Sequence, residues 1–311
     1  MKKKIIIIDK MHPSILPGLE SEGIDFNYLP DISRDELKSI IQDYNGIIVR
    51  SKTNIDKEML DLGINLKFIA RAGAGTDKID DAYCMEKGIE IFNAPEGNRD
   101  ALGEHTIGIL LALFNKIHAG DSEIKNGIWD REGNRGIEIS GKVVGIIGYG
   151  FMGSAFAQRL SGFDCEVIAY DKYKDNYADK NARAVDLDEI FKKADILSLH
   201  VPLNAETNGL YVPDFFMNFK KNIFLVNTSR GPVLPLSGLI QLLDTGKIMG
   251  AALDVLENEK LKSYNNAEKI VFNNLINRKN VVLTPHVGGW SFESYKKIND
   301  VLIQKIASFI I

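Results

Sequence analysis

Gly148-Tyr149-Gly150-Phe151-Met152-Gly153 directly follows the apolar run Val143-Val144-Gly145-Ile146-Ile147, an order typical of a strand that turns sharply into a helix. Gly148 permits the tight turn, and Gly150 lets the backbone come close to a pyrophosphate. Gly153 allows the helix to pack closely on the strand, with the pyrophosphate at the positive N-terminal end of that helix. The pattern predicts a dinucleotide-binding loop.

The residues around these glycines supply the context that a G-x-G-x-x-G pattern needs. A strand at 143–147 precedes them, a helix at about 152–162 follows, and a second strand at 166–170 ends at Asp171. Asp171 lies 23 residues after Gly148, close to the offset of about 20 residues expected for the acid that binds an adenosine ribose. The alternative is a glycine turn in a βα unit that binds nothing.

The composition is that of an ordinary soluble globular protein. The 311 residues are 45% hydrophobic and 26% charged, with a formal net charge of −4, and the length suits about two domains. The acidic balance argues against a nucleic-acid partner, and no apolar run is long enough for a membrane span or a signal-peptide core. Cys84 and Cys165 lie in no metal or redox spacing, so we expect buried thiols, no metal and a cytoplasmic location.

Short apolar strands alternate with helical stretches, which is typical of parallel α/β architecture. Before the glycine motif we expect strands at 4–9, 25–28, 46–50, 67–71 and 89–92, with helices at about 13–22, 34–43, 56–62 and 77–87. From the motif onward we expect strands at 143–147, 166–170, 195–199, 223–227, 249–254 and 280–284. Long helices at about 100–120 and 291–309 flank this second set.

No strand follows the last helix, so the economical topology is discontinuous. We expect an α/β protein in which a Rossmann-type nucleotide-binding domain is inserted into a flavodoxin-like α/β substrate domain. The substrate domain would comprise residues 1–100 plus 290–311, and the NAD-binding domain residues 101–289. The helices at 100–120 and 291–309 would be the crossovers.

Three motifs follow strands of the nucleotide unit, at the edge where open α/β sheets bind ligands. They supply Arg230, Glu259 and His286. Arginine binds a carboxylate through a planar two-point fork. Histidine exchanges a proton with an alcohol near neutral pH, and a neighbouring carboxylate orients it and stabilises its protonated form. Beside a dinucleotide, this set predicts hydride transfer to or from a hydroxy acid.

With these motifs the chain resembles the D-isomer-specific 2-hydroxyacid dehydrogenase family, and within it the phosphoglycerate dehydrogenase branch in a short form without a regulatory domain. The resemblance runs almost end to end. The matching segments are Arg71–Asp77, Asn93–Asn98, Glu104-His105, Gly148–Gly153, His200–Leu203, Asn227–Gly231, Gly250–Val255 and Pro285-His286. It implies the cofactor NAD, and hydride transfer between the nicotinamide and C2 of a D-2-hydroxy acid.

The resemblance also implies roles for single residues. His286 would be the acid/base, Glu259 its partner, and Arg230 the ligand of the substrate carboxylate. The other residues that would bind substrate are Arg50, Ser51, Ala74, Gly75 and Asn98. The residues that would bind NAD are Gly148, Tyr149, Gly150, Phe151, Met152, Gly153, Asp171, His200, Val201, Pro202, Thr207, Thr228, Ser229, Arg230, Asp254, His286 and Gly289. Lys260 stands where the family usually has proline, which puts the Glu259–His286 pairing in doubt.

The expected substrate pair is 3-phosphoglycerate and 3-phosphohydroxypyruvate, a reaction of serine biosynthesis. Arg50 matches a substrate arginine of the phosphoglycerate branch, and Lys52 could add a second positive charge. The alternative for Arg50 is a surface ion pair with Asp56 or Glu58. Two alternatives for the whole chain stay open: a reductase of glyoxylate, hydroxypyruvate or another 2-keto acid, and a non-enzymatic NAD-sensing protein of the corepressor type.

The helix at 100–120 is also the expected site of assembly. Its apolar residues Ile107, Leu110, Leu111 and Phe114 exceed what one small domain obviously needs to bury, and the resemblance implies pairing in this region. We therefore expect a two-fold homodimer. For His105, on the same helix, we expect a packing or interface role.

Overall fold

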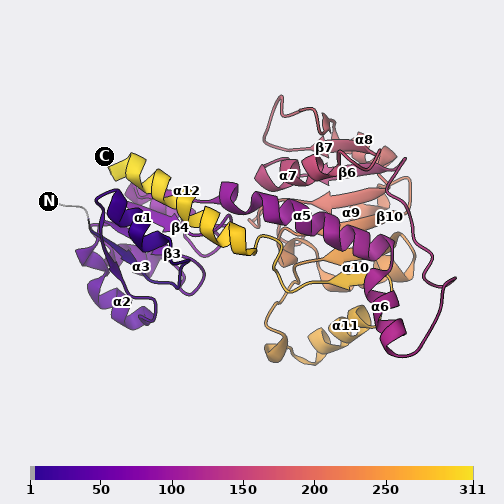
Figure 1. The fold of residues 1–311 in the computed structure, drawn as a ribbon, viewed down its shortest axis with the longest axis horizontal. Helices are drawn as coiled ribbons and strands as arrows, with labels where there is room; N and C mark the ends of the chain where they lie inside the picture. Colours follow the sequence, from indigo (N-terminus) through magenta and orange to yellow (C-terminus); the bar gives the residue numbers. More distant parts are fainter. Residues whose placement is uncertain (1–3, 311) are drawn as a thin grey trace. The chain divides into compact units, whose positions relative to one another are not determined.

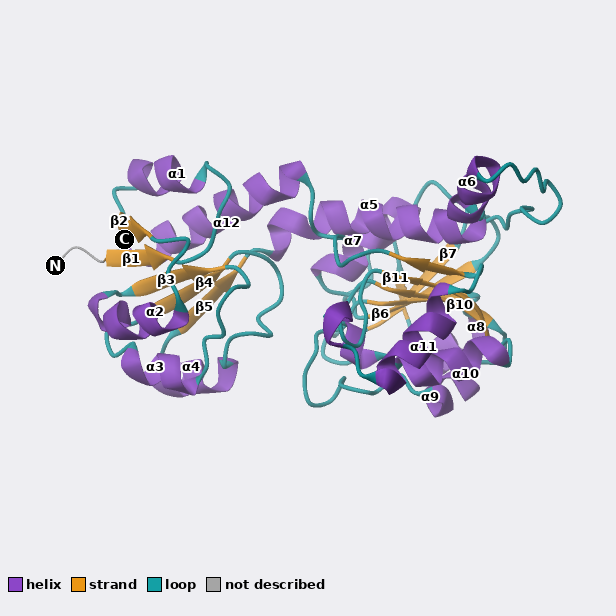
Figure 2. Ribbon diagram, turned by 90° about the horizontal axis from the view of Figure 1, so that it is seen from below, coloured by secondary structure: helices purple, strands orange, loops and turns teal. Residues whose placement is uncertain are grey.

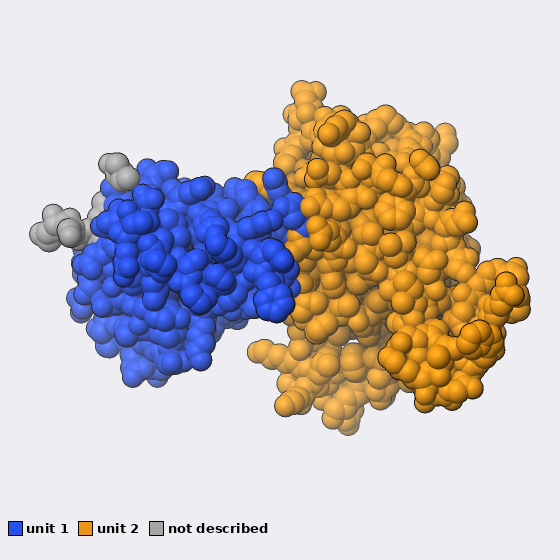
Figure 3. All heavy atoms as spheres, viewed as in Figure 1, with its two compact units in different colours: residues 1–100, 290–311 blue, residues 101–289 orange. Residues whose placement is uncertain are grey.

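The computed structural model describes residues 4–310, which divide into two compact units (Figures 1 and 3). Unit 1 holds the residues up to Asp100 and those from Trp290 onward, and unit 2 is Ala101–Gly289. The chain passes between them twice, within α5 (Pro95–Phe114) and just before α12 (Phe292–Ile310). No helix within residues 4–310 combines the length and the apolar composition needed to cross a membrane.

Unit 1 is built on a five-stranded parallel sheet of order β2-β1-β3-β4-β5, the flavodoxin-like order. Its strands are β1 (Lys4–Ile7), β2 (Asp25–Tyr28), β3 (Gly46–Val49), β4 (Phe68–Arg71) and β5 (Glu90–Asn93). Its shorter helices are α1 (Ile15–Ser21), α2 (Arg34–Ile40) with the 3₁₀ turn η1 (Ile41–Asp43), α3 (Lys57–Leu62) and α4 (Asp81–Lys87). Figure 2 shows α1 and α12 on one face and α2, α3 and α4 on the other.

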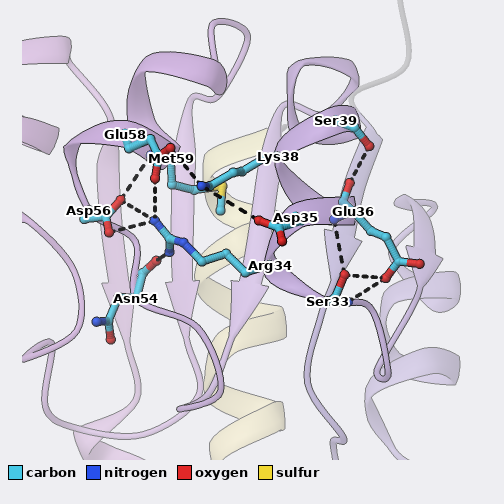
Figure 4. Close-up of polar contacts among 10 residues, drawn as sticks. All are labelled: Ser33, Arg34, Asp35, Glu36, Lys38, Ser39, Asn54, Asp56, Glu58 and Met59. Carbon is cyan, nitrogen blue, oxygen red and sulfur yellow. Dashed lines mark hydrogen bonds and ion pairs between the residues drawn. The ribbon is translucent and has the colours of Figure 1, made fainter.

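Charged contacts tie α2 to α3 in unit 1 (Figure 4). Arg34 Nη2 donates to both carboxylate oxygens of Asp56 at 2.7 Å, and it lies 3.3 Å from Glu58 Oε2. Lys38 Nζ donates to the other oxygen of Glu58 at 2.8 Å. Asp56 and Glu58 therefore pair with Arg34 and Lys38. The alternative pairing of these two acids with Arg50 is wrong.

Unit 2 is built on a seven-stranded parallel sheet of order β12-β11-β10-β9-β6-β7-β8. The strands are β6 (Val143–Ile147), β7 (Glu166–Tyr170), β8 (Arg183–Ala184), β9 (Ile196–Leu199), β10 (Ile223–Asn227), β11 (Ile248–Leu253) and β12 (Val281–Leu283). Counted from β6, this is the Rossmann order 3-2-1-4-5-6 extended by a seventh strand. The strand order reverses between β6 and β9, which pair directly. The expected fold class, a Rossmann-type domain inserted into a flavodoxin-like α/β domain, is confirmed.

Helices cover both faces of the unit 2 sheet (Figure 2). One face carries α5 and α7 (Phe151–Leu160), with α6 (Ile117–Lys125) following α5. The other face carries α8 (Leu187–Lys193), α9 (Pro213–Met217), α10 (Leu236–Asp244) and α11 (Asn266–Ile276). The 3₁₀ turns η2 (Gly231–Val233) and η3 (Leu261–Ser263) lie in the loops that carry Arg230 and Glu259. Two apolar cores, one on each face of the sheet, result from this arrangement.

The helix expected at about 100–120 is wrong in its bounds. α5 begins at Pro95, because proline is well tolerated in the first turn of a helix. It ends at Phe114, and Lys116 then adopts a left-handed conformation (φ 51°) before α6 begins.

The two cysteine thiols differ in burial: Cys84 is buried as expected, whereas Cys165 is only half-buried.

The apolar residues expected at a dimer interface lie elsewhere. Leu110 and Phe114 are buried in the core of unit 2, and Ile107 and Leu111 pack against that core. Parallel sheets need cover on both faces, and α5 provides it here. Exposed apolar side chains follow in α6 and the segment after it, among them Ile117, Ile124, Ile128 and Trp129.

Two glycines of α5 offer a matched test of this packing. A Cβ on Gly103 would lie 2.8 Å from the carbonyl oxygen of Ala155 in α7, whereas a Cβ on Gly108 would meet no described atom within 4 Å. We expect Gly103→Ala to lower the free energy of unfolding by about 1–3 kcal/mol, because α5 must move away from α7. Gly108→Ala should raise it by up to about 1 kcal/mol, through helix propensity alone. Urea unfolding of both variants measures the difference, and equal effects would contradict it.

Candidate active site

The three glycine positions after β6 require glycine for different physical reasons. A Cβ on Gly148, whose φ is +92°, would lie 2.4 Å from the carbonyl oxygen of His200, and a Cβ on Gly153 would lie 2.1 Å from that of Gly148. The packing of unit 2 itself therefore requires glycine at both positions. A Cβ on Gly150 would meet no described atom within 4 Å. The open space beside Gly150 fits a ligand that approaches the backbone.

Helix α7 begins directly after this glycine turn. Its N-cap is Gly150, and no side chain of the described residues caps its first turn. The first N–H groups of a helix carry a partial positive charge and accept an anion as partner. The open space and the helix end together fit a dinucleotide pyrophosphate.

Asp171 lies beside the same turn, directly after β7. Its Oδ2 accepts the N–H of Tyr149 at 2.8 Å, and its Oδ1 accepts the N–H of Tyr173 at 3.0 Å. Two nearby lysines are held elsewhere: Lys172 pairs with Glu206 at 2.7 Å, and Lys174 donates to the carbonyl oxygen of Tyr149 at 3.0 Å. The carboxylate of Asp171 is thus fixed at the place where an adenosine ribose is expected.

The residues after β9 form the other side of the switch between β6 and β9. His200 Nε2 lies 2.8 Å from Ser198 Oγ, and its Nδ1 has no hydrogen-bond partner among residues 4–310. Burial lowers the pKa of His200 to about 3, so its ring is neutral at physiological pH. Thr207 Oγ1 donates to the carbonyl oxygen of Pro202 at 2.6 Å and closes the turn that follows Val201.

Arg230 follows β10 in a loop with a tightly held backbone. Asn227 Oδ1 accepts the N–H of Ser229 at 3.0 Å, and Asn227 Nδ2 donates to the carbonyl oxygen of Arg230 at 3.2 Å. A Cβ on Gly231 would lie 1.8 Å from the carbonyl oxygen of Leu256. Only glycine lets this loop lie against the segment that leads to Glu259. The side chains of Thr228 and Ser229 are buried, so contacts of this loop with a cofactor would come mainly from its backbone.

His286 and Glu259 form a close pair across two loops of unit 2. His286 Nδ1 lies 2.9 Å from Glu259 Oε1 and 3.1 Å from Oε2. With Nδ1 bonded to the carboxylate, Nε2 is left to exchange a proton with a substrate. Both side chains are 46% exposed, so the pair orients the ring more than it stabilises the fold. Lys260, in the place of the family's proline, does not keep the two groups apart.

The loop that holds Glu259 is fixed by hydrogen bonds within unit 2. The hydroxyl of Tyr264 donates to the carbonyl oxygen of Asn258 at 2.5 Å, and Asn258 Nδ2 donates to Glu268 at 2.8 Å. The N–H of Lys260 donates to Asn258 Oδ1 at 3.0 Å. Asn258, which the sequence analysis did not single out, directly precedes Glu259; it is fixed by Glu268 and Tyr264, and it binds the backbone of Lys260, the residue after Glu259.

Asp254 anchors the loop that carries His286. It is 1% exposed, and its Oδ1 accepts from the Thr284 hydroxyl at 2.6 Å. The N–H of Val287 donates to Oδ1 at 3.0 Å and the N–H of Gly288 to Oδ2 at 2.7 Å. Burial opposes ionisation of the carboxyl, but these bonds and one from His105 outweigh it and lower its pKa. The sequence analysis assigned Asp254 to cofactor binding and missed this anchoring role. The available signal was an acid at the end of a strand together with a glycine-containing loop after the next strand.

In unit 1, Arg50 follows β3 beside two aromatic rings. Its N–H donates to Asp9 Oδ2 at 2.7 Å, and its guanidinium lies 4.1 Å from the ring centre of Trp290 and 5.5 Å from that of Tyr295. Stacked rings hold a guanidinium flat and leave the N–H groups at its edge free to point toward an anion. Lys52 donates instead to the carbonyl oxygens of Pro30 and Ile32. Lys52, expected to add a second positive charge for the phosphate, therefore binds backbone carbonyl oxygens instead.

The other expected substrate residues of unit 1 lie after β3, after β4 and in α5. The carbonyl oxygen of Ala74 accepts from Asn93 Nδ2 at 2.7 Å, which fixes the loop that includes Gly75. The carbonyl oxygen of Ser51 accepts from Lys78 at 2.5 Å. Asn98, in the first part of α5, has a buried Oδ1 with no hydrogen-bond partner among the described residues. An unpaired buried amide oxygen suits a site completed by a ligand.

Comparison with known proteins identifies the family. Residues 107–288, more than half of the chain, match the model described as "D-isomer specific 2-hydroxyacid dehydrogenase, NAD binding domain". The chain belongs to the D-isomer-specific 2-hydroxyacid dehydrogenase family. The cofactor of this family member is therefore NAD, and unit 2 holds the NAD-binding domain.

Similar proteins carry the names of different activities. The D-3-phosphoglycerate dehydrogenase of Archaeoglobus fulgidus is 32% identical over 98% of the chain, which spans only 57% of that enzyme. The hydroxypyruvate reductase of Thermotoga maritima is 33% identical over 96% of the chain and 94% of its own length. A solved acyclic imino acid reductase, in complex with NADPH and D-Arg, is 31% identical, with a TM-score of 0.85 over 98% of this chain and 96% of that one.

The placement of Asp171 leads to a prediction on cofactor choice for this family member. A carboxylate accepts hydrogen bonds from both ribose hydroxyls but repels a 2′-phosphate. We expect kcat/KM with NAD to exceed that with NADP by at least about tenfold, and Asp171→Asn to narrow the ratio. Asp175→Asn, the same change of charge on an exposed residue nearby, should leave the ratio unchanged. Steady-state kinetics with both cofactors measures it, and an equal kcat/KM in the unmodified protein would contradict it.

Proposed function

We propose that this family member is an NAD-dependent D-2-hydroxyacid dehydrogenase that interconverts 3-phosphoglycerate and 3-phosphohydroxypyruvate. The observation that carries the enzymatic part is the His286–Glu259 pair at 2.9 Å. The segment that leads to Glu259 lies against the loop that holds Arg230. Unit 1 would supply substrate-binding residues and unit 2 the NAD-binding and catalytic residues. A non-enzymatic NAD sensor would show no turnover on any 2-hydroxy or 2-keto acid.

Each catalytic or binding residue of unit 2 then has a separate role in the reaction. When bound, NAD accepts or returns a hydride at its nicotinamide ring. Nε2 of His286 takes the hydroxyl proton of the substrate during oxidation and returns it during reduction. Glu259, at Nδ1, orients the ring and stabilises the imidazolium. Arg230 binds the substrate carboxylate through its guanidinium fork.

The substrate assignment rests on Arg50. The guanidinium of Arg50 lies over Trp290, and the backbone N–H of Arg50 is fixed by Asp9. A phosphate oxygen at the edge of the guanidinium would form charge-assisted hydrogen bonds. A small 2-keto acid such as glyoxylate has no second anionic group for such a contact. Reduction of hydroxypyruvate is the second candidate. The Thermotoga maritima relative is a hydroxypyruvate reductase, and the chain matches 94% of its length.

We also propose that two copies of the chain associate through α6 and the segment that follows it. None of the nine described residues of α6 is buried, and Ile117, Ile124, Ile128 and Trp129 are 58, 53, 52 and 84% exposed. An apolar strip of this kind suits a second copy, since a two-fold axis lets the same surface cover itself. We expect light scattering to give twice the mass of one chain, and Trp129→Asp to shift the protein toward the monomer. A monomer at micromolar concentration would overturn the proposal.

The acid/base role is tested by His286→Ala. Losing proton transfer should lower kcat by about 10²–10⁴-fold, because general acid/base catalysis contributes that much. NAD binding, followed by titration calorimetry, should change little. A variant that keeps near-normal kcat at neutral pH would refute the role of His286.

The phosphate contact is tested by Arg50→Ala. We expect KM for 3-phosphoglycerate to rise at least about tenfold, because the variant loses charge-assisted hydrogen bonds, while kinetics on a small 2-keto acid change little. Lys52→Ala is the matched control: it also removes a positive charge after β3, yet KM should stay nearly unchanged because Lys52 binds backbone carbonyls. If the unmodified protein prefers glyoxylate or hydroxypyruvate to phosphohydroxypyruvate in kcat/KM, the phosphate contact is wrong and reduction of the preferred keto acid is the better assignment.

A further inference from the structure

A polar cluster in unit 2 joins α5 to the loop that carries His286. His105, in α5, has its Nε2 3.2 Å from Asp254 Oδ1 and 3.0 Å from Thr284 Oγ1. The single hydroxyl proton of Thr284 is donated to Asp254, so Nε2 of His105 must carry a proton and donate to this pair. A Cβ on Gly288 would lie 2.9 Å from Asp254 Oδ2 and 3.4 Å from Cδ2 of His105. The cluster is therefore closely packed as well as hydrogen-bonded.

The loop held by this cluster has a strained backbone. His286 adopts φ 54°, in the left-handed region that residues other than glycine rarely occupy. Its N–H donates to the carbonyl oxygen of Asp254 at 2.7 Å, and the next two N–H groups donate to the Asp254 carboxylate. Such a conformation persists only where the surroundings over-determine it. Asp254 supplies that constraint, and the orientation of its carboxylate decides where the imidazole lies.

The same cluster joins the two segments in which the chain passes between the units. His105 follows the boundary at Asp100–Ala101 by a few residues, and Gly288 precedes the boundary at Gly289–Trp290. Both segments meet at the buried carboxylate of Asp254. The hydrogen bond of His105 thus fixes the departing end of the catalytic loop to α5.

We propose that His105 is a positioning residue for His286: by donating to Asp254 and Thr284 it holds the carboxylate that binds the N–H groups of Val287 and Gly288 and so keeps His286 in its left-handed conformation. The proposal rests on the acid/base role of His286. Without His105, Asp254 loses one of its donors and the packing beside Gly288 opens. The imidazole of His286 then samples positions away from the substrate hydroxyl, and displacements of about 1 Å cost up to about 100-fold in rate.

The test compares His105→Leu with His105→Gln, whose amide nitrogen can stand in for Nε2. The probe is NADH with phosphohydroxypyruvate or hydroxypyruvate, whichever the unmodified protein reduces faster. We expect His105→Leu to lower kcat by about 10- to 100-fold with KM for NADH nearly unchanged, and His105→Gln to restore most of it. Glu104→Gln, on the adjacent exposed residue of α5, is the control and should keep normal kcat. Combined with Thr284→Val, His105→Leu should cost less than the product of the two single effects, because both act on Asp254.

Each other outcome is decisive. Normal kcat in His105→Leu, or a His105→Gln variant as slow as His105→Leu, overturns the positioning role while the loss of activity in His286→Ala leaves the proposed function standing. A raised KM for NADH at unchanged kcat also overturns it, since that result is the sign of cofactor binding. Normal kcat in His286→Ala overturns the proposed function and this proposal together. If His105→Leu does not fold, His105→Asn, whose amide is too short to reach Asp254, takes its place with the same expectations.

Discussion

Parallel pairing places the carboxyl ends of β6, β9, β10, β11 and β12 at one edge of the unit 2 sheet. The glycine turn, the His200 loop and the loops of Arg230, Asp254 and His286 each follow one of these ends. Segments more than a hundred residues apart in the chain therefore meet without any long excursion. In an antiparallel sheet, half of these loops would lie at the opposite edge, and the site would not assemble.

Close backbone approaches then bring the loops together. Gly148 against His200, Gly153 against Gly148 and Gly231 against Leu256 each leave no room for a Cβ. Gly150 differs from these three, because the protein leaves open space there. Glycine thus serves two purposes in these loops: contact with the protein's own backbone, and the open space that the proposed pyrophosphate site needs.

Because Asp254 is buried, its carboxylate needs more hydrogen-bond donors than the exposed acid Glu259 does. A buried carboxylate costs several kcal/mol unless donors surround it, and here the donors are His105, Thr284 and the N–H groups of Val287 and Gly288. Those donors all belong to segments that the active site must position. The need to pair one buried charge therefore orders the loop that carries His286, whereas the exposed Glu259 only orients its ring.

Local patterns were enough for every strand except the two-residue β8, and for the glycine turn and the family, because strand alternation, turn glycines and strand-end motifs depend on neighbouring residues. Tertiary contacts decided the rest. The end of α5 at Phe114, the burial of Leu110 and Phe114, the pairing of Asp56 with Arg34, and the use of Lys52 on backbone carbonyls all depend on distant partners. The same holds for His105, for which the sequence predicted only a packing or interface role. Its hydrogen bonds join segments 149 and 179 residues apart and leave no periodic trace in the sequence.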